Sequence, residues 1–167
     1  MTKRPLADPA AAVRSRPLPD PQALPETDTA AQSAAAETAD AVREVVAAAL
    51  DKKAADLKVL EVGELTHFTD YFLVCSGENP RQVQAIADGV ERRLRDHKLR
   101  PSHVEGYQTG QWVLMDYGDF VLHVFLHERR RFYGLERLWG DAPDLTADFV
   151  GAAEAEARAA SSGRQLS

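Results

Sequence analysis

The stretch 104–127, VEGYQTGQWVLMDYGDFVLHVFLH, constrains the fold of this chain more than any other. It contains two β-rich runs, 111–117 and 120–126, separated only by Gly118 and Asp119. Glycine in the first position of a two-residue loop is typical of a type II′ turn, which joins two antiparallel strands. The stretch therefore predicts a β-hairpin, and the turn determines which residues of the two strands face each other.

The hairpin register separates two kinds of surface, because side chains alternate between the faces of a sheet. One face is almost wholly apolar and is expected to pack against core helices: Val113, Met115, Tyr117, Phe120, Leu122 and Val124. The opposite face, which we call the mixed face, consists of Trp112, Leu114, Asp116, Val121, His123 and Phe125. One carboxylate and one imidazole interrupt its aromatic and aliphatic surface, so a function is expected there. The alternative is structural, with Asp116 and His123 as a satisfied polar pair and Trp112 as part of the core.

The chain before the hairpin predicts a helix, two strands and a second helix. Apolar residues recur at helical spacing over 38–55, and the apolar runs 57–62 and 71–75 are typical of strands, the second one covered on both faces. Asn79 and Pro80 suit the start of the second helix as N-cap and first helical residue. Its predicted buried stripe is Val83, Ile86, Val90 and Leu94.

The order of elements predicts the fold class. A further strand is expected from Val104, followed by the hairpin, a charged bend at 128–131 and a last short helix over 132–138. This order favours an α/β (mixed α+β) fold, with a single mixed five-stranded sheet and helices packed on it. The expected domain covers 37–143, between a disordered Pro/Ala-rich arm (1–36) and a weakly ordered tail (144–167), because neither flank contains enough apolar residues to offset the entropy of ordering.

Charge and cysteine content exclude several classes of protein. The chain of 167 residues carries 26 acidic and 20 basic side chains, so it lacks the basic excess by which many proteins hold nucleic acid. Cys75 is the only cysteine, which excludes an intrachain disulfide and a cysteine metal cluster. Neither a secretory signal nor a membrane-spanning segment is evident, so a reducing, cytoplasmic location is expected.

Patterns that could carry chemistry are weak. Ser76 and Gly77, between a strand and a helix, could bring backbone amides to a phosphate, but no Gly-x-Gly-x-x-Gly and no Walker lysine accompanies them. Asp116 and Asp119 are not expected to converge on one metal ion, because Asp119 lies in the turn. We therefore expect no catalytic residue, no metal site and no cofactor. Arginines near 92–100 and 129–131 could contact RNA, although a solvated charged surface explains them equally well.

Short motifs follow one another in a specific order from residue 69 to residue 143. They are Thr69-Asp70-Tyr71-Phe72, Ser76-Gly77, Arg81-Gln82-Val83, Ala85-Ile86-Ala87-Asp88, Val104-Glu105-Gly106, Trp112-Val113-Leu114, Asp116, Gly118-Asp119, Val121, His123, Phe125, Tyr133, Leu135-Glu136, Leu138-Trp139-Gly140-Asp141 and Pro143. In this order and spacing the set resembles the ribosomal silencing factors, also called Iojap-like or RsfS proteins. The resemblance covers roughly residues 38–143.

The resemblance implies a non-enzymatic factor that binds the large ribosomal subunit through its protein L-fourteen, prevents joining of the small subunit and so represses translation. It also implies a sheet like that of nucleotidyltransferases. Trp112 and Tyr133 would be apolar anchors for the partner, with Asp70, Asp116 and His123 as polar or supporting positions. Free protein could form a homodimer through the same surface. The alternative functions are a nucleotidyltransferase-like enzyme and a direct RNA-binding module.

Overall fold

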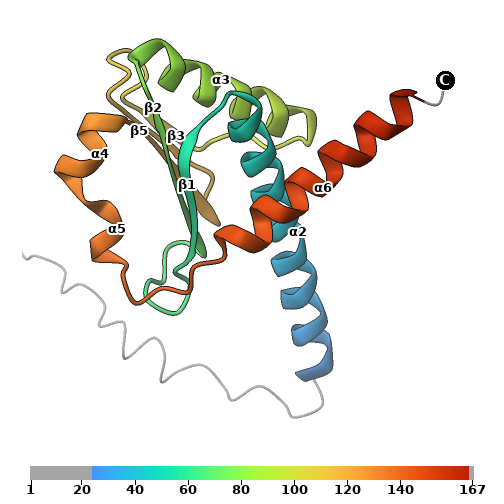
Figure 1. Cartoon of the computed structure of the whole chain (residues 1–167). Coiled ribbons are helices and arrows are strands. Elements are labelled where there is room, and N and C mark those ends of the chain that lie inside the picture. The colour runs from blue at the N-terminus through green and yellow to red at the C-terminus, as the bar shows by residue number, and fades with distance from the viewer. Residues whose placement is uncertain (1–23, 166–167) are drawn as a thin grey trace, which may run out of the picture. The chain divides into compact units, whose positions relative to one another are not determined.

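The computed structural model describes residues 24–165, and by internal contacts the chain divides into residues 1–36 and 37–167. In chain order the elements are α2 (Leu24–Asp51), β1 (Ala55–Glu61), β2 (Tyr71–Gly77), α3 (Pro80–Asp96), β3 (His103–Glu105), β4 (Trp112–Asp116), β5 (Phe120–Leu126), α4 (His127–Tyr133), α5 (Leu135–Leu138) and α6 (Thr146–Gln165) (Figure 1). Within residues 24–165, no helix combines the length and the apolar character that crossing a membrane requires.

One mixed sheet contains all five strands in the order β1-β2-β5-β4-β3. β2 and β5 are parallel neighbours, and the other pairs are antiparallel. The predicted mixed α+β class with a single five-stranded sheet is confirmed. Because β2 and β5 run in the same direction, their carboxyl ends at Gly77 and Leu126 lie at the same edge of the sheet.

The hairpin of β4 and β5 has the register that the turn predicts. Trp112 pairs with Phe125, and the Tyr117 amide donates a hydrogen bond to the Phe120 carbonyl at 3.0 Å. Gly118 has a φ of +87°, which the first position of a type II′ turn requires and which residues with a side chain rarely adopt. A two-residue loop and one glycine therefore determine which side chains lie on each face.

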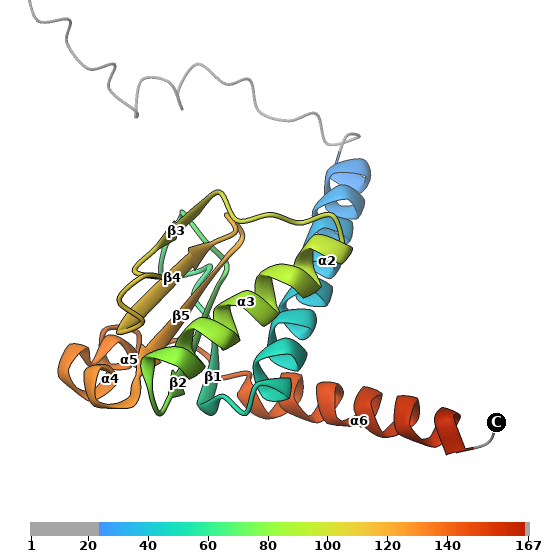
Figure 2. The same cartoon turned by 90° about the horizontal axis from the view of Figure 1, so that it is seen from above.

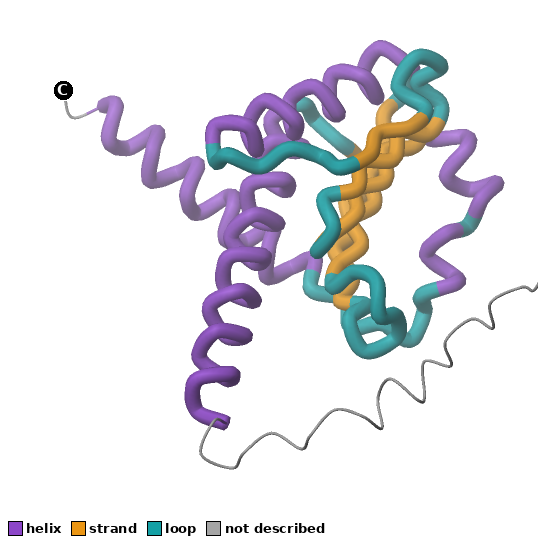
Figure 3. The backbone as a smooth tube through the Cα atoms, turned by 180° about the vertical axis from the view of Figure 1, so that it is seen from behind, coloured by secondary structure: helices purple, strands orange, loops and turns teal. Residues whose placement is uncertain are grey.

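Helices α2, α3 and α6 cover one face of the sheet, and α4 and α5 lie on the other (Figures 2 and 3). The apolar face of the hairpin packs against the first group of helices. The main core cluster joins Val113, Met115, Phe120, Leu122 and Val124 to Val42, Val45 and Val46 of α2, to Val83, Ile86, Val90 and Leu94 of α3, and to Phe149 of α6. The predicted stripe of α3 is confirmed, and the chain's own helices cover this face of the sheet.

Helix α3 begins as the sequence predicts. The Asn79 side chain accepts a hydrogen bond from the Gln82 amide at 2.8 Å, and Pro80 occupies the first turn. We expect Asn79→Ala to lower the free energy of unfolding by about 1 kcal/mol, because one amide at the helix start loses its acceptor. Asn79→Asp keeps an acceptor and is the control. Urea unfolding curves that show equal losses for both variants would contradict the capping role.

The two ends of the domain are more helical than the sequence predicts. α2 begins at Leu24, within the predicted arm, and residues 1–23 of that arm lie outside the described residues. Alanine-rich chain before residue 38 extends a helix that packing has already nucleated, and each added residue then costs little. The predicted weakly ordered tail contains α6, where Phe149 packs edge-on against Tyr71, with ring centroids 6.0 Å apart.

The segment after the hairpin also differs from its prediction. Residues 128–131, predicted as a charged bend, belong to α4, and the predicted single helix over 132–138 is divided at Gly134. Gly134 has a φ of +54° and its amide donates to the Arg130 carbonyl at 3.0 Å, which ends α4. The glycine thus allows α5 to leave in a new direction.

Candidate functional site

The mixed face is half covered by the chain itself. Val121, His123 and Phe125 of β5 are buried, whereas Trp112, Leu114 and Asp116 of β4 are only partly buried. A second, smaller core cluster covers the β5 side: Leu60, Val62, Phe72, Val121 and Ala142, with Leu114 and Trp139 packed against it. The β4 side is therefore the part of this face that can still reach another molecule.

An aromatic group lies where β4 begins and α4 ends. The ring centroids of Trp112 and Phe125 are 4.9 Å apart in a stacked arrangement, and Tyr133 covers Trp112 at 4.7 Å. Phe132 meets Tyr133 edge-on at 5.3 Å. Phe132 is 77% exposed and Tyr133 46% exposed, so rings that contact one another continue from the core to solvent. We call Trp112, Phe132 and Tyr133 the ring surface.

His123 is buried and holds Trp112 of the ring surface by a hydrogen bond. Its Nδ1 accepts a hydrogen bond from Trp112 Nε1 at 3.1 Å, so the proton of the neutral imidazole is on Nε2. Nε2 is buried without a hydrogen-bond partner among the described residues, and the ring lies edge-on to Phe72 at 5.4 Å. Burial lowers the pKa of His123 from 6.5 to about 4, because the surroundings disfavour the charged form.

The depressed pKa of His123 predicts a loss of stability in acid. The unfolded chain takes up a proton near pH 6.5 and the folded chain only near pH 4, so stability falls as the pH drops between these values. The loss amounts to about 3 kcal/mol, at 1.36 kcal/mol per pKa unit. His123→Asn keeps an acceptor for Trp112 but does not titrate, and its unfolding free energy should fall less over this range. If the unfolding free energies of the two proteins fell equally between pH 6.5 and pH 4, His123 would not be the cause of the acid destabilisation.

The structure brings three of the predicted site residues together and leaves two elsewhere. Trp112 contacts both of the others, His123 through the hydrogen bond and Tyr133 through the ring contact given above. Asp116 lies at the other end of β4, about 13 Å along the strand from Trp112 at ~3.3 Å per residue. Its Oδ1 accepts from the Gly118 amide at 2.8 Å, so the alternative pair with His123 is replaced by separate partners. Asp70 is exposed just before β2, and its amide donates to the Asp119 carbonyl at 2.8 Å.

The residues considered for phosphate or metal chemistry are engaged in structural contacts. Ser76 is buried and its Oγ accepts from Arg130 Nη1 at 2.8 Å, while the Glu78 amide donates to Gln82 Oε1 at 2.7 Å. Burial raises the pKa of the Cys75 thiol to about 12, which opposes its use as a nucleophile. Within residues 24–165, no group of three or more His, Cys, Asp or Glu side chains is arranged to hold a metal ion.

Sequence reasoning missed the outermost members of this region. The spacing of Phe132 and Leu138 predicts a short helix, and they lie in α4 and α5, but they are 77% and 75% exposed. Arg130, treated as part of a charged bend, has a nearly buried side chain. A signal for this exposure is present in the sequence, because the segment 127–138 combines aromatic and leucine residues with arginines and is too short for a core helix.

The match to a family model decides the relationship to known proteins. The model described as "Ribosomal silencing factor during starvation" matches residues 35–166. The chain belongs to this ribosomal silencing factor family. The residues that match the family model include α6, which lies beyond the motifs at 69–143.

Three similar proteins match between 60% and 78% of this chain. "Ribosomal silencing factor RsfS" of Bacillus subtilis is 42% identical over 103 residues, which are 62% of this chain and 87% of that protein. "Protein Iojap, chloroplastic" of Zea mays is 30% identical over 131 residues, 78% of this chain and 54% of that protein. A crystal structure of a protein from Chromobacterium violaceum has a TM-score of 0.60 at 35% identity and covers 60% of this chain and 84% of its own.

Proposed function

We propose that this protein binds the large ribosomal subunit through ribosomal protein L-fourteen and sterically blocks association with the small subunit. Translation in the cytoplasm would thereby be repressed without any chemical reaction. Membership of the ribosomal silencing factor family supports the ribosomal role. The observation that carries the choice of surface is the exposure of Phe132 (77%) and Tyr133 (46%) beside the partly buried Trp112.

The ring surface has the properties of a binding anchor. Aromatic residues concentrate binding energy when a partner encloses them, and large exposed rings gain most from leaving water. Trp112 is already held by Tyr133 and by its hydrogen bond to His123, so little side-chain freedom is left to lose on binding. The proposal assigns Trp112 and Tyr133 as apolar anchors, and His123 as the residue that orients Trp112.

Asp70 and Asp116 have a smaller role in the proposed contact than the aromatic residues. Asp70 and Asp116 lie away from the ring surface, and Asp116 already accepts from the Gly118 amide. They would act at the border of the contact, where exposed charges influence the rate of association more than affinity. Free protein would pair with a second copy through the same rings, since a large apolar patch is rarely left uncovered.

A steric mechanism predicts stoichiometric action. A domain that covers a standard interface, about 800 Å² on each partner, excludes anything that must occupy the same place. Inhibition should therefore rise with the occupancy of large subunits and stop at one protein per subunit. An enzyme would instead act far below that ratio.

Purified ribosomal subunits test the proposal directly. Sedimentation after mixing should show that increasing protein reduces joined ribosomes, and the protein should travel with the large subunit and not with the small one. Undiminished joining at saturating protein would overturn the proposal. Binding to naked ribosomal RNA that weakens steeply with salt, without binding to isolated L-fourteen, would favour the RNA-binding alternative.

A further inference from the structure

The segment 127–138, which forms α4 and α5, carries much of the exposed apolar surface but is weakly anchored by apolar packing. Its ring contacts with the sheet are those of Tyr133 with Trp112 and Phe125. Neither helix contains a buried residue, and no residue of the segment belongs to either core cluster. Phe132, Tyr133 and Leu138 are nevertheless exposed at 77%, 46% and 75%. Rings can anchor a partner only if their positions are held, so another interaction has to hold this segment on the sheet.

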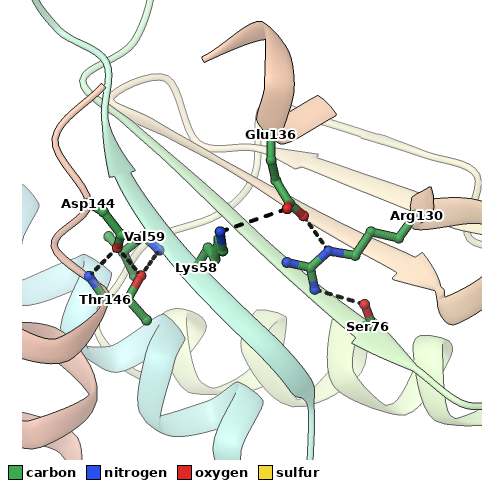
Figure 4. Close-up of polar contacts among 7 residues, drawn as sticks. All are labelled: Lys58, Val59, Ser76, Arg130, Glu136, Asp144 and Thr146. Carbon is green, nitrogen blue, oxygen red and sulfur yellow. Dashed lines mark hydrogen bonds and ion pairs between the residues drawn. The ribbon is translucent and has the colours of Figure 1, made fainter. Parts of the chain in front are cut away.

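Arg130 supplies that interaction. Its side chain is only 10% exposed, points from α4 toward the sheet and donates two hydrogen bonds to different elements (Figure 4). Nη1 donates to Ser76 Oγ at the end of β2 at 2.8 Å, and Nε donates to Glu136 Oε1 of α5. The Glu136 carboxylate also lies 4.0 Å from Lys58 Nζ of β1. One guanidinium thus ties α4 to α5 and both of them to the sheet.

The local backbone allows this geometry. Gly134, with a φ of +54°, ends α4 and turns the chain so that Glu136 comes back to the side chain of Arg130. The planar guanidinium presents donors in different directions at fixed angles, and it remains charged when almost buried. A lysine ammonium is a single point and cannot reach Ser76 and Glu136 with separate, fixed donor groups.

We propose that Arg130 is a positioning residue for the ring surface. Bound to Ser76 and Glu136, it holds α4 and α5 against the carboxyl ends of β2 and β5, so that Tyr133 stays on Trp112 and Phe132 is displayed beside it. The binding consequence rests on the proposed function, because it needs a partner for the ring surface. The holding of the segment is a property of the free protein and can be measured without a ribosome.

Hydrogen exchange of the free protein tests whether Arg130 holds the segment 127–138 on the sheet. We expect Arg130→Met to speed exchange of the amides in 127–138 by about tenfold or more, while α3 and β5 keep wild-type rates, because local opening depends on local contacts. Arg129→Met removes an exposed arginine of the same helix and should leave these rates unchanged. Ser76→Ala and Glu136→Ala each remove one acceptor of Arg130 and should give smaller increases, which keeps the test valid if Arg130→Met does not fold. Wild-type exchange rates in 127–138 in each folded variant of Arg130, Ser76 and Glu136 overturn the proposal.

Affinity for purified large subunits tests whether positioning by Arg130 strengthens binding through the ring surface. Arg130→Met should bind roughly tenfold or more weakly, since part of the binding energy must first order the segment, and Arg130→Lys should not restore wild-type affinity. Binding equal to wild type, in a variant whose segment exchanges faster, overturns the positioning role and leaves the proposed function intact. Failure of the wild-type protein to bind large subunits overturns the proposed function instead.

Discussion

Replacing Trp112 by alanine is expected to weaken binding to the large ribosomal subunit by about 2 to 4 kcal/mol, roughly 30- to 1,000-fold. Trp112 contacts Phe125, Tyr133 and His123 while remaining partly open to solvent. Its removal deletes the central ring and the support for its neighbours together. Affinity can be measured by co-sedimentation with purified large subunits over a range of protein concentrations.

Controls separate the loss of binding from a loss of folding. Trp112→Phe keeps an aromatic ring but removes the hydrogen bond to His123 Nδ1, so its affinity should lie between those of wild type and Trp112→Ala. The circular dichroism spectrum and the urea midpoint of each variant establish that the domain is folded. Wild-type affinity in a folded Trp112→Ala protein would move the interface away from the ring surface.

Replacing Phe125 by alanine is expected to have the largest effect on stability, about 3 to 5 kcal/mol. Phe125 is fully buried beneath the ring surface and contacts Trp112 at 4.9 Å and Tyr133 at 6.0 Å between ring centroids. The cavity left by its ring cannot close easily, because β5 is a central strand paired on both sides. Urea unfolding measures the loss as a lower midpoint at constant slope.

Phe132→Ala is a matched control, because it makes the same substitution where the side chain is 77% exposed. Little stability should be lost, since the ring is already mostly in water. Affinity for the large subunit should fall, because Phe132 is part of the ring surface. A stability loss as large as that of Phe125→Ala would show that Phe132 is buried in solution, and the description of the ring surface would then be wrong.

Local signals predicted much of the fold because they act over a few residues. The pair Gly118-Asp119 determines the hairpin register, and the 3.6-residue period of Val83, Ile86, Val90 and Leu94 determines the buried side of α3. The mixed face was predicted by alternation alone. The partial exposure of its β4 side was not, because exposure depends on which other segments pack against each strand.

Segments with weak local signals were predicted less well. α6 has the composition of a marginal helix, and its first turns are held by Phe149 in the core and by the Leu145 amide, which donates to the Val59 carbonyl at 2.9 Å. The start of α2 was missed since an alanine-rich segment forms little helix by itself but extends one that packing has begun. In both cases tertiary contacts outweighed composition.

The hairpin, its two faces and the helix that follows β2 could be predicted from local pattern, because turn chemistry and periodicity need no distant partner. Which predicted site residues meet depends on long-range packing. It placed His123 under Trp112, left Asp70 and Asp116 apart, and joined Arg130 to Ser76 and Glu136. Residues 54 positions apart in the chain, such as Ser76 and Arg130, become neighbours only when strands pair and helices pack. Contacts of that kind have no signature in a local pattern, because packing of the whole chain brings their partners together.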